Sequence, residues 1–168
     1  MSADTVPFYK IPDPPAAASA GAILGRLADA IGFRFRWATE GIRDADLPFK
    51  PAADCWSLAQ LIDHIADLLE PVAKAVGARQ HPPLAQQAGF VALRARILDL
   101  SAGLSARFKA MPDADLAGAS AGKLSVWTMV NGNLADILTH IGQILSWRRL
   151  AGSPPAAPDL FQGLPPRG

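Results

Sequence analysis

Apolar residues recur at helical spacing in four segments of the chain, and clusters of prolines separate these segments. Because proline lacks a backbone N–H and clashes with the preceding turn, the helices should lie between the clusters. The first helix should begin near Pro15 or Ala16, since proline is tolerated in an opening turn. The other three helices are predicted over the ranges 57–77, 87–110 and 126–150.

Local signals mark both ends of the second helix. Ser57 and Gln60 form a capping-box pattern, which is typical of a helix start. Pro71 lies inside the same segment, where it could kink the helix. Gly77 or the loop at 78–83 should end it.

The segment before the last helix should be irregular. Residues 113–125 are rich in Gly, Ala, Ser and Asp, which predicts a loop with a short hairpin around Gly122. Gly152, with two prolines after it, should stop the last helix. The core positions predicted from the apolar stripes of the first and last helices are Ile23, Leu27, Ala30, Ile31 and Phe35, and Leu134, Ile137, Leu138, Ile141, Ile144 and Leu145.

Alanine is abundant and β-branched residues are sparse in the periodic segments, which favours helix over strand. Four long helices in one compact chain predict an all-α four-helix bundle. We expect an extended N-terminal arm over 1–14, the bundle over 15–152 and a Pro/Gly-rich tail over 153–168. The long connections between the first two and the last two helices leave the order of the helices in the bundle open.

Composition narrows the classes of partner. The formal net charge is +1 without a run of Lys or Arg, so electrostatics gives no argument for nucleic acid. Charged residues interrupt every apolar stretch, which argues against a membrane span. The N-terminus lacks the pattern of a secretory signal, and the single cysteine, Cys55, suits a reducing compartment. These features predict a cytoplasmic protein.

Two histidines lie at the edges of predicted core faces. On helical wheels, His64 is about 100° from the apolar centre of the second helix, and His140 is about 100° from that of the last. Asp136 precedes His140 by four residues, so both side chains project from one face. Two imidazoles and a carboxylate form a facial ligand set for Zn, Ni, Fe or Mn, with positions left open for water or substrate.

A plainer interpretation of these residues stays open. Histidines at the border of an apolar face are common, and Asp136 could simply be solvated. His81 precedes two prolines in a loop and is a weaker candidate for any functional role.

Two motifs resemble those of the DinB-like superfamily. Trp56-Ser57, followed by His64-Ile65, resembles the second-helix signature of this family, and His140-Ile141-Gly142-Gln143 resembles its closing H-x-G-Q motif. The segments GFRFRWATEGIRDADL and THIGQILSWRRLAGSP resemble an uncharacterised bacterial branch. The resemblance covers residues 20–154.

The resemblance implies a homodimeric four-helix bundle with one divalent metal ion held by three histidines. His64 and His140 match the first and last of these ligands, whereas Asp136 stands where the family pattern has the middle histidine. Characterised members are transferases and isomerases that use a low-molecular-weight thiol such as bacillithiol or mycothiol, and others resemble hydrolases.

Two functions follow as hypotheses. In the first, a divalent metal on His64, Asp136 and His140 activates water or a low-molecular-weight thiol for transfer or hydrolysis on a small-molecule substrate. In the second, the chain is a non-enzymatic bundle that binds an apolar ligand or a protein partner, and its metal site is degenerate. The aspartate at the middle ligand position supports the second hypothesis.

The remaining candidates are interpreted mainly as structural. Gln60, Asp67 or Gln143 could orient a ligating imidazole. Cys55 is expected to be a small buried filler, and core or interface packing is favoured over pocket lining for Trp56, Trp127 and Trp147. The arginines are expected to be solvated on the first helix (Arg26, Arg34, Arg36 and Arg43) or to face the dipole at the end of the last (Arg148 and Arg149).

Overall fold

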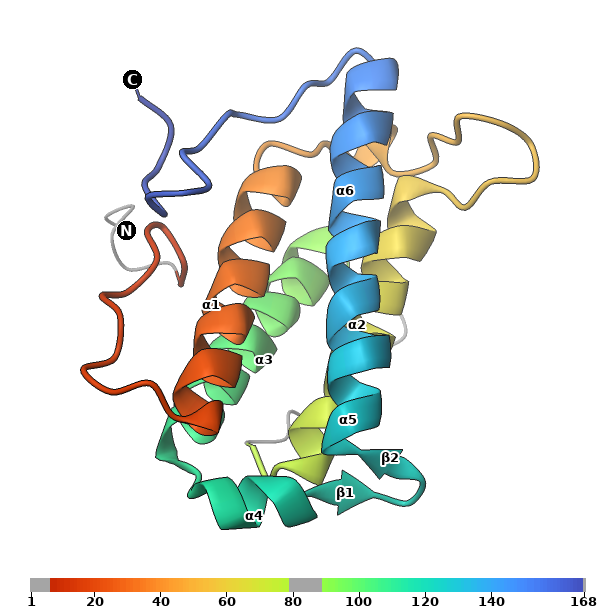
Figure 1. Cartoon of the computed structure of the whole chain (residues 1–168). Helices are drawn as coiled ribbons and strands as arrows, with labels where there is room; N and C mark the ends of the chain where they lie inside the picture. Colours follow the sequence, from red (N-terminus) through yellow and green to blue (C-terminus); the bar gives the residue numbers. More distant parts are fainter. Residues whose placement is uncertain (1–6, 79–88, 168) are drawn as a thin grey trace.

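A computed structural model describes residues 7–78 and 89–167 of the chain. Within these residues the protein is an all-α bundle, as predicted (Figure 1). The four long helices are α1 (Ala20–Thr39), α2 (Leu58–Ala75), α3 (Phe90–Ala110) and α6 (Ala135–Leu150). His81 and the predicted start of the third helix at residue 87 lie outside the described residues, as do positions 1–6 of the expected arm.

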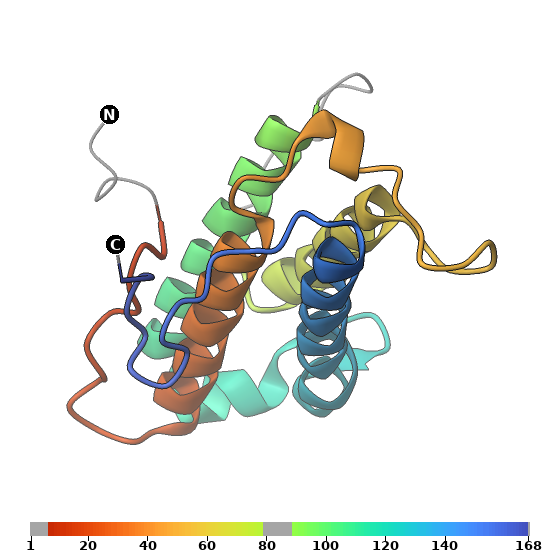
Figure 2. The ribbon, with the colours of Figure 1, turned by 90° about the horizontal axis from the view of Figure 1, so that it is seen from above.

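The helices form a ring in which neighbours along the chain are not always neighbours in space. α1 contacts α3 and α6, and α2 contacts the same two helices, so α1 and α2 lie diagonally across the bundle (Figure 2). The long connection at 40–57 spans this diagonal and includes the short helix η2 (Asp44–Asp46). Consequently α2 and α6 stand side by side, which decides where the two histidines can meet.

The connection from α3 to α6 is more regular than predicted. The expectation of a plain loop over 113–125 was wrong at its start, where a short helix forms, whereas the hairpin around Gly122 is confirmed. Asp113 and Asp115 lie in the first turn of that helix, where the helix dipole favours acidic side chains. The elements are α4 (Asp113–Gly118), β1 (Ser120–Ala121), β2 (Leu124–Ser125), α5 (Val126–Thr128) and η3 (Met129–Leu134), a π-helical turn.

Side-chain caps explain where α1 and α2 begin. The Ser19 hydroxyl accepts a hydrogen bond from the Ala22 amide at 3.1 Å, so α1 starts several residues later than the prolines predicted. In α2 the capping box is confirmed: the Gln60 amide donates to the Ser57 hydroxyl, and the Ser57 amide donates to the Gln60 side chain at 2.9 Å. α2 continues past Pro71 to Ala75, and Gly77 follows with a positive φ.

α1 packs closely on α3 through small residues near its start, while Ile31 and Phe35 of the predicted apolar stripe are buried in the core as expected. Ile23 was expected in the core but is 62% exposed. Instead Gly21 and Gly25 face α3, and a Cβ on Gly21 would lie only 2.3 Å from the Phe108 carbonyl oxygen. The apolar spacing of this segment did not reveal this face, because glycine contributes little to an apolar pattern, although it permits the closest approach of two backbones.

A buried polar contact crosses the same interface. Asp29 is almost fully buried, and its carboxylate accepts hydrogen bonds from Lys109 Nζ at 2.6 Å and from Ser105 Oγ at 2.5 Å. The pairing satisfies a charge that would otherwise be costly to bury.

Arg36 was expected to be solvated but is buried, with its guanidinium over the rings of Tyr9 and Trp37 at 5.6 and 5.2 Å.

Arg148 lies in the last turn of α6, as expected, and it also joins three separate parts of the chain. Its side chain is buried, and Nη1 donates to the Ala38 and Glu40 carbonyls at 2.9 and 2.7 Å. Its Nε donates to the Ser153 carbonyl, and the Ser153 hydroxyl donates to Asp46. One guanidinium therefore ties the end of α6 to the end of α1 and to the first residues of the tail.

The tail returns along α1 and meets the arm (Figures 1 and 2). The Ile11 amide donates to the Gly163 carbonyl at 2.9 Å, and Phe8 packs against Gly32. Of the two apolar tail residues, Leu160 is partly covered, whereas Phe161 is 98% exposed. None of the helices in the described part of the chain is both long and apolar enough to cross a bilayer.

The close approach of α1 and α3 predicts opposite effects for two Gly→Ala substitutions. At Gly21 the added methyl meets the Phe108 carbonyl, so Gly21→Ala should lower the free energy of unfolding by about 1–3 kcal/mol. Gly103 of α3 has open space around it, so Gly103→Ala should raise stability by about 0.5–1 kcal/mol through better helix propensity. Urea denaturation measures both. Equal effects of the two substitutions would contradict the packing.

The surroundings of Asp46 predict a specific acid sensitivity. Hydrogen bonds from the Arg43 side chain and amide hold the pKa of the Asp46 carboxyl well below its usual range, and the Ser153 hydroxyl adds to the effect. A lowered folded-state pKa contributes stability above the unfolded pKa of about 3.9, and this contribution is lost as the pH falls further.

Asp46→Asn should therefore flatten the acid limb of the stability curve below about pH 4, as measured by urea denaturation between pH 3 and 7. Asp44→Asn, which changes an exposed carboxyl in the same turn, is the control and should follow the native protein. Parallel curves for native protein and Asp46→Asn would contradict the role of this carboxyl.

Candidate metal centre

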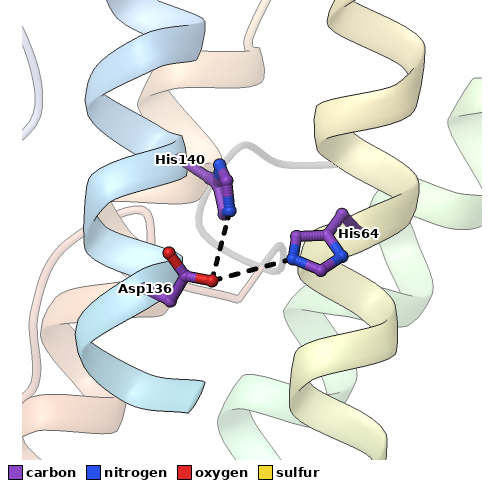
Figure 3. A group of neighbouring side chains, drawn as sticks. All are labelled: His64, Asp136 and His140. Carbon is purple, nitrogen blue, oxygen red and sulfur yellow. Dashed lines mark ion pairs between the residues drawn. The ribbon is translucent and has the colours of Figure 1, made fainter. Parts of the chain in front are cut away.

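The three predicted ligand residues converge between α2 and α6. His64 projects from α2, and Asp136 and His140 project from successive turns of α6 toward it (Figure 3). Asp136 Oδ2 lies 3.4 Å from His140 Nε2 and 3.7 Å from His64 Nε2, and one ligand atom from each residue lies within 4.8 Å of the others. We call these three residues the His–Asp–His cluster.

Apolar packing between α2 and α6 holds the cluster in place. Ile65 next to His64, and Ile137 and Ile141 flanking the α6 ligands, are fully buried. Because each ligand residue is adjacent in sequence to a core residue, its side chain stands at the border of the interface, as the helical wheels predicted. The Asn133 side chain also donates to the Leu68 carbonyl at 2.9 Å, which attaches the π-helical turn η3 to α2 one turn before Asp136.

The spacing of the ligand atoms suits a single cation. Two atoms that each lie about 2.0–2.1 Å from a tetrahedral ion are about 3.3–3.4 Å apart. The 3.4 Å and 3.7 Å separations about Asp136 Oδ2 are close to this value. The side chain of His140 is 12% exposed, that of His64 30% and that of Asp136 45%, so the cluster opens toward solvent on the carboxylate side.

Gln143 orients one of the imidazoles. Its Oε1 lies 2.7 Å from His140 Nδ1. With the amide oxygen facing the ring, the contact favours a proton on Nδ1, which leaves Nε2 of the neutral ring as a lone-pair donor facing the cluster. Gln143 thus has the orienting role considered for it, whereas Gln60 does not, since its side chain is used in the α2 cap.

An aromatic wall lies beside the cluster. The Trp56 ring stacks on His140 with centroids 5.7 Å apart and meets His64 edge-on at 4.9 Å. A cavity of about 280 Å³ next to it is lined by Cys55, Trp56, Leu61, His140, Gln143 and Trp147. The expectation that these tryptophans serve packing alone was therefore incomplete.

The other aromatic and acidic candidates are placed elsewhere. Trp127 is 79% exposed, and it does not line this cavity. Cys55 is half-buried at the cavity wall rather than a buried filler. Asp67 lies on the exposed side of α2. Its charge adds to the desolvation that raises the pKa of the nearby Asp63 carboxyl.

Comparison with known families gives one match. The family model of the DinB superfamily matches residues 27–144, a range that contains the whole His–Asp–His cluster. Comparisons with curated proteins and with solved structures found no match.

The Gln143 contact predicts the tautomer of His140. In native protein the neutral ring should carry its proton on Nδ1, and Gln143→Leu should move the proton toward Nε2 because the acceptor is lost. Two-bond ¹⁵N–¹H correlation spectra distinguish the two tautomers. Gln143→Glu, which keeps an acceptor at the same position, should keep the proton on Nδ1 of the neutral ring, while its charge also favours the doubly protonated ring. An Nε2-protonated ring in native protein would contradict the orienting role.

Proposed function

The chain belongs to the DinB superfamily, and on this basis we propose that the His–Asp–His cluster is the divalent-metal centre of an enzyme acting on a small molecule. The observation that carries the proposal is the convergence of three side chains from two helices on one point. His64 and His140 supply imidazole nitrogens and Asp136 supplies a carboxylate, a donor set that suits Zn, Ni, Fe or Mn.

The proposed chemistry is activation of a nucleophile. A bound divalent ion would act as a Lewis acid that lowers the pKa of a water or thiol ligand. Three protein ligands leave coordination positions open for such a ligand. We propose that the nucleophile is water or a low-molecular-weight thiol, and that the reaction is transfer or hydrolysis.

The residues around the cluster support this use. Gln143 holds the His140 ring with Nε2 facing the cluster, so the ring need not reorient when it binds a cation. Trp56, Trp147 and Leu61 give the adjoining cavity apolar walls. A volume of about 280 Å³ is at the lower end of small-molecule sites, which restricts the substrate to a small one.

One observation favours the second candidate function, a non-enzymatic bundle with a degenerate site. Asp136 is nearly half exposed and stands where the family pattern has histidine. The distances alone are also compatible with an ion pair between Asp136 and a protonated imidazole. Metal binding separates the two candidates.

For both candidate functions we propose that the protein is a cytoplasmic homodimer. The homodimer is the assembly that the family resemblance implies, and analytical ultracentrifugation measures the mass of the assembly.

We expect about one transition-metal ion per chain in protein purified without an affinity tag. His64→Ala and His140→Ala should each abolish stoichiometric binding, because two ligands rarely suffice to hold an ion. Asp136→His should retain the ion and favour Zn or Ni over Mn, since imidazole suits those metals better than carboxylate does. Elemental analysis and isothermal titration with each metal provide the measurement.

His81→Ala is the matched control and should keep the native metal content. The metal-loaded native protein and the metal-free His64→Ala variant are then assayed with thiol and electrophile pairs and with small esters and amides. Activity in the first protein alone supports the enzyme. Protein that binds none of Zn, Ni, Fe or Mn would overturn the proposal in favour of the non-enzymatic bundle.

A further inference from the structure

A second, larger cavity lies on the other side of α6. It occupies about 550 Å³ between α1, α6 and the tail, and its volume is typical of small-molecule sites, which span about 300–1,000 Å³. The walls are mainly apolar: Leu27 of α1 and Leu138, Ile141 and Leu145 of α6 face the tail residues Pro158 and Leu160. In Figures 1 and 2 the tail passes beside α1.

The cavity is separate from the His–Asp–His cluster. α6 contacts α1 on one side and α2 on the other, and the residues of the two sites occupy different faces of this helix. The cluster uses Asp136 and His140, whereas the cavity uses positions 138, 141 and 145. No residue lines both cavities described here.

The polar side chains that line this cavity, those of Arg34, Trp37 and Arg149, are all hydrogen-bond donors. Trp37 is 8% exposed, and its Nε1 has no hydrogen-bond partner within the described residues. Arg34 and Arg149 also line the cavity, and neither forms a salt bridge with an acidic side chain in the described part of the chain. A buried indole N–H without an acceptor is costly, so an acceptor on a bound molecule would stabilise Trp37 Nε1.

The acid of the tail segment that lines the cavity does not supply that acceptor. Asp159 lies between two lining residues, Pro158 and Leu160, but its Oδ1 accepts hydrogen bonds from the Phe161 and Gln162 amides at 3.0 and 2.9 Å. Its carboxylate therefore closes the tail's own turn, and the two arginines keep their positive charge available to a ligand.

We propose that this cavity binds an amphipathic carboxylate, a molecule with an apolar body and one anionic head group. The apolar body would displace water from the walls formed by α1, α6 and the tail. The head group would meet Arg34 and Arg149, whose planar guanidinium groups pair well with carboxylates. This ligand class matches both the apolar walls and the donor side chains of Arg34, Trp37 and Arg149.

Gly142 leaves room for such a ligand. It is exposed in the middle of α6, lines the cavity, and a Cβ built on it meets no atom within 4 Å. A larger side chain at this position can therefore project into the cavity without disturbing the bundle. Gly142→Leu should fill the space and also favour the helix, so loss of binding in this variant would not result from unfolding.

The probe for the test is octanoate, with octan-1-ol as the uncharged analogue of equal chain length. In ¹⁵N-labelled full-length protein, octanoate should shift the indole N–H signal of Trp37, assigned through Trp37→Phe, while the signal of exposed Trp127 stays in place. Arg34→Gln/Arg149→Gln should weaken octanoate binding by about tenfold or more and leave octanol binding within about twofold. Gly142→Leu should abolish binding of both compounds.

Two controls complete the experiment. Lys50→Gln/Lys123→Gln removes the same charge from exposed positions that do not line the cavity, and it should bind octanoate as the native protein does. His64→Ala should also bind octanoate normally, so failure of the metal centre and failure of this proposal are distinguishable. An unmoved Trp37 signal at millimolar octanoate, unchanged binding by Gly142→Leu, or equal weakening in both charge-removing double variants would overturn the proposal.

Discussion

The apolar contact between α2 and α6 is the constraint on which the site depends. Rigid, fully buried aliphatic residues on both helices set the distance between the two backbones. The ligand residues stand at the edge of this contact, so a change in helix separation would change the 3.7 Å between His64 and Asp136 directly. A His–Asp–His cluster built on helices in this way is positioned more precisely than one built on loops.

The rest of the bundle keeps those two helices in register. Arg148 at the end of α6 is hydrogen-bonded to the end of α1 and to Ser153, while Asn133 attaches the opposite end to α2. α6 is thereby held at both ends as well as along its apolar face. The close packing of Gly21 on α3 fixes the opposite side of the bundle, and the tail lies along α1.

α6 is also the element that separates two chemically different regions. Its α2 side carries imidazoles and a carboxylate beside aromatic rings, and its α1 side carries aliphatic residues beside arginines. A single helix can present both because residues one position apart point about 100° away from each other. If both proposals hold, a small molecule bound on one side could affect the other only through movement of α6 itself.

Much of the fold and of the cluster was predictable from residue spacing. Proline positions and apolar periodicity predicted the four helices, and the i, i+4 pair on α6 with a border histidine on α2 predicted the cluster. The burial of charged residues was harder to predict from the sequence. Arg36 was expected in solvent and Arg148 at a helix end facing the dipole, yet both are buried, because the rings and carbonyls that surround them come from distant segments.

By itself, therefore, the sequence determined the local features of this protein: where its helices lie, how α2 is capped, and which side chains share a face. These follow from neighbours within a few residues. Only the tertiary structure decided that α2 stands next to α6, that Gly21 replaces Ile23 in the contact with α3, and that the tail encloses a cavity. Those features depend on how distant segments pack. The spacing of residues along one segment does not determine which helix faces contact each other.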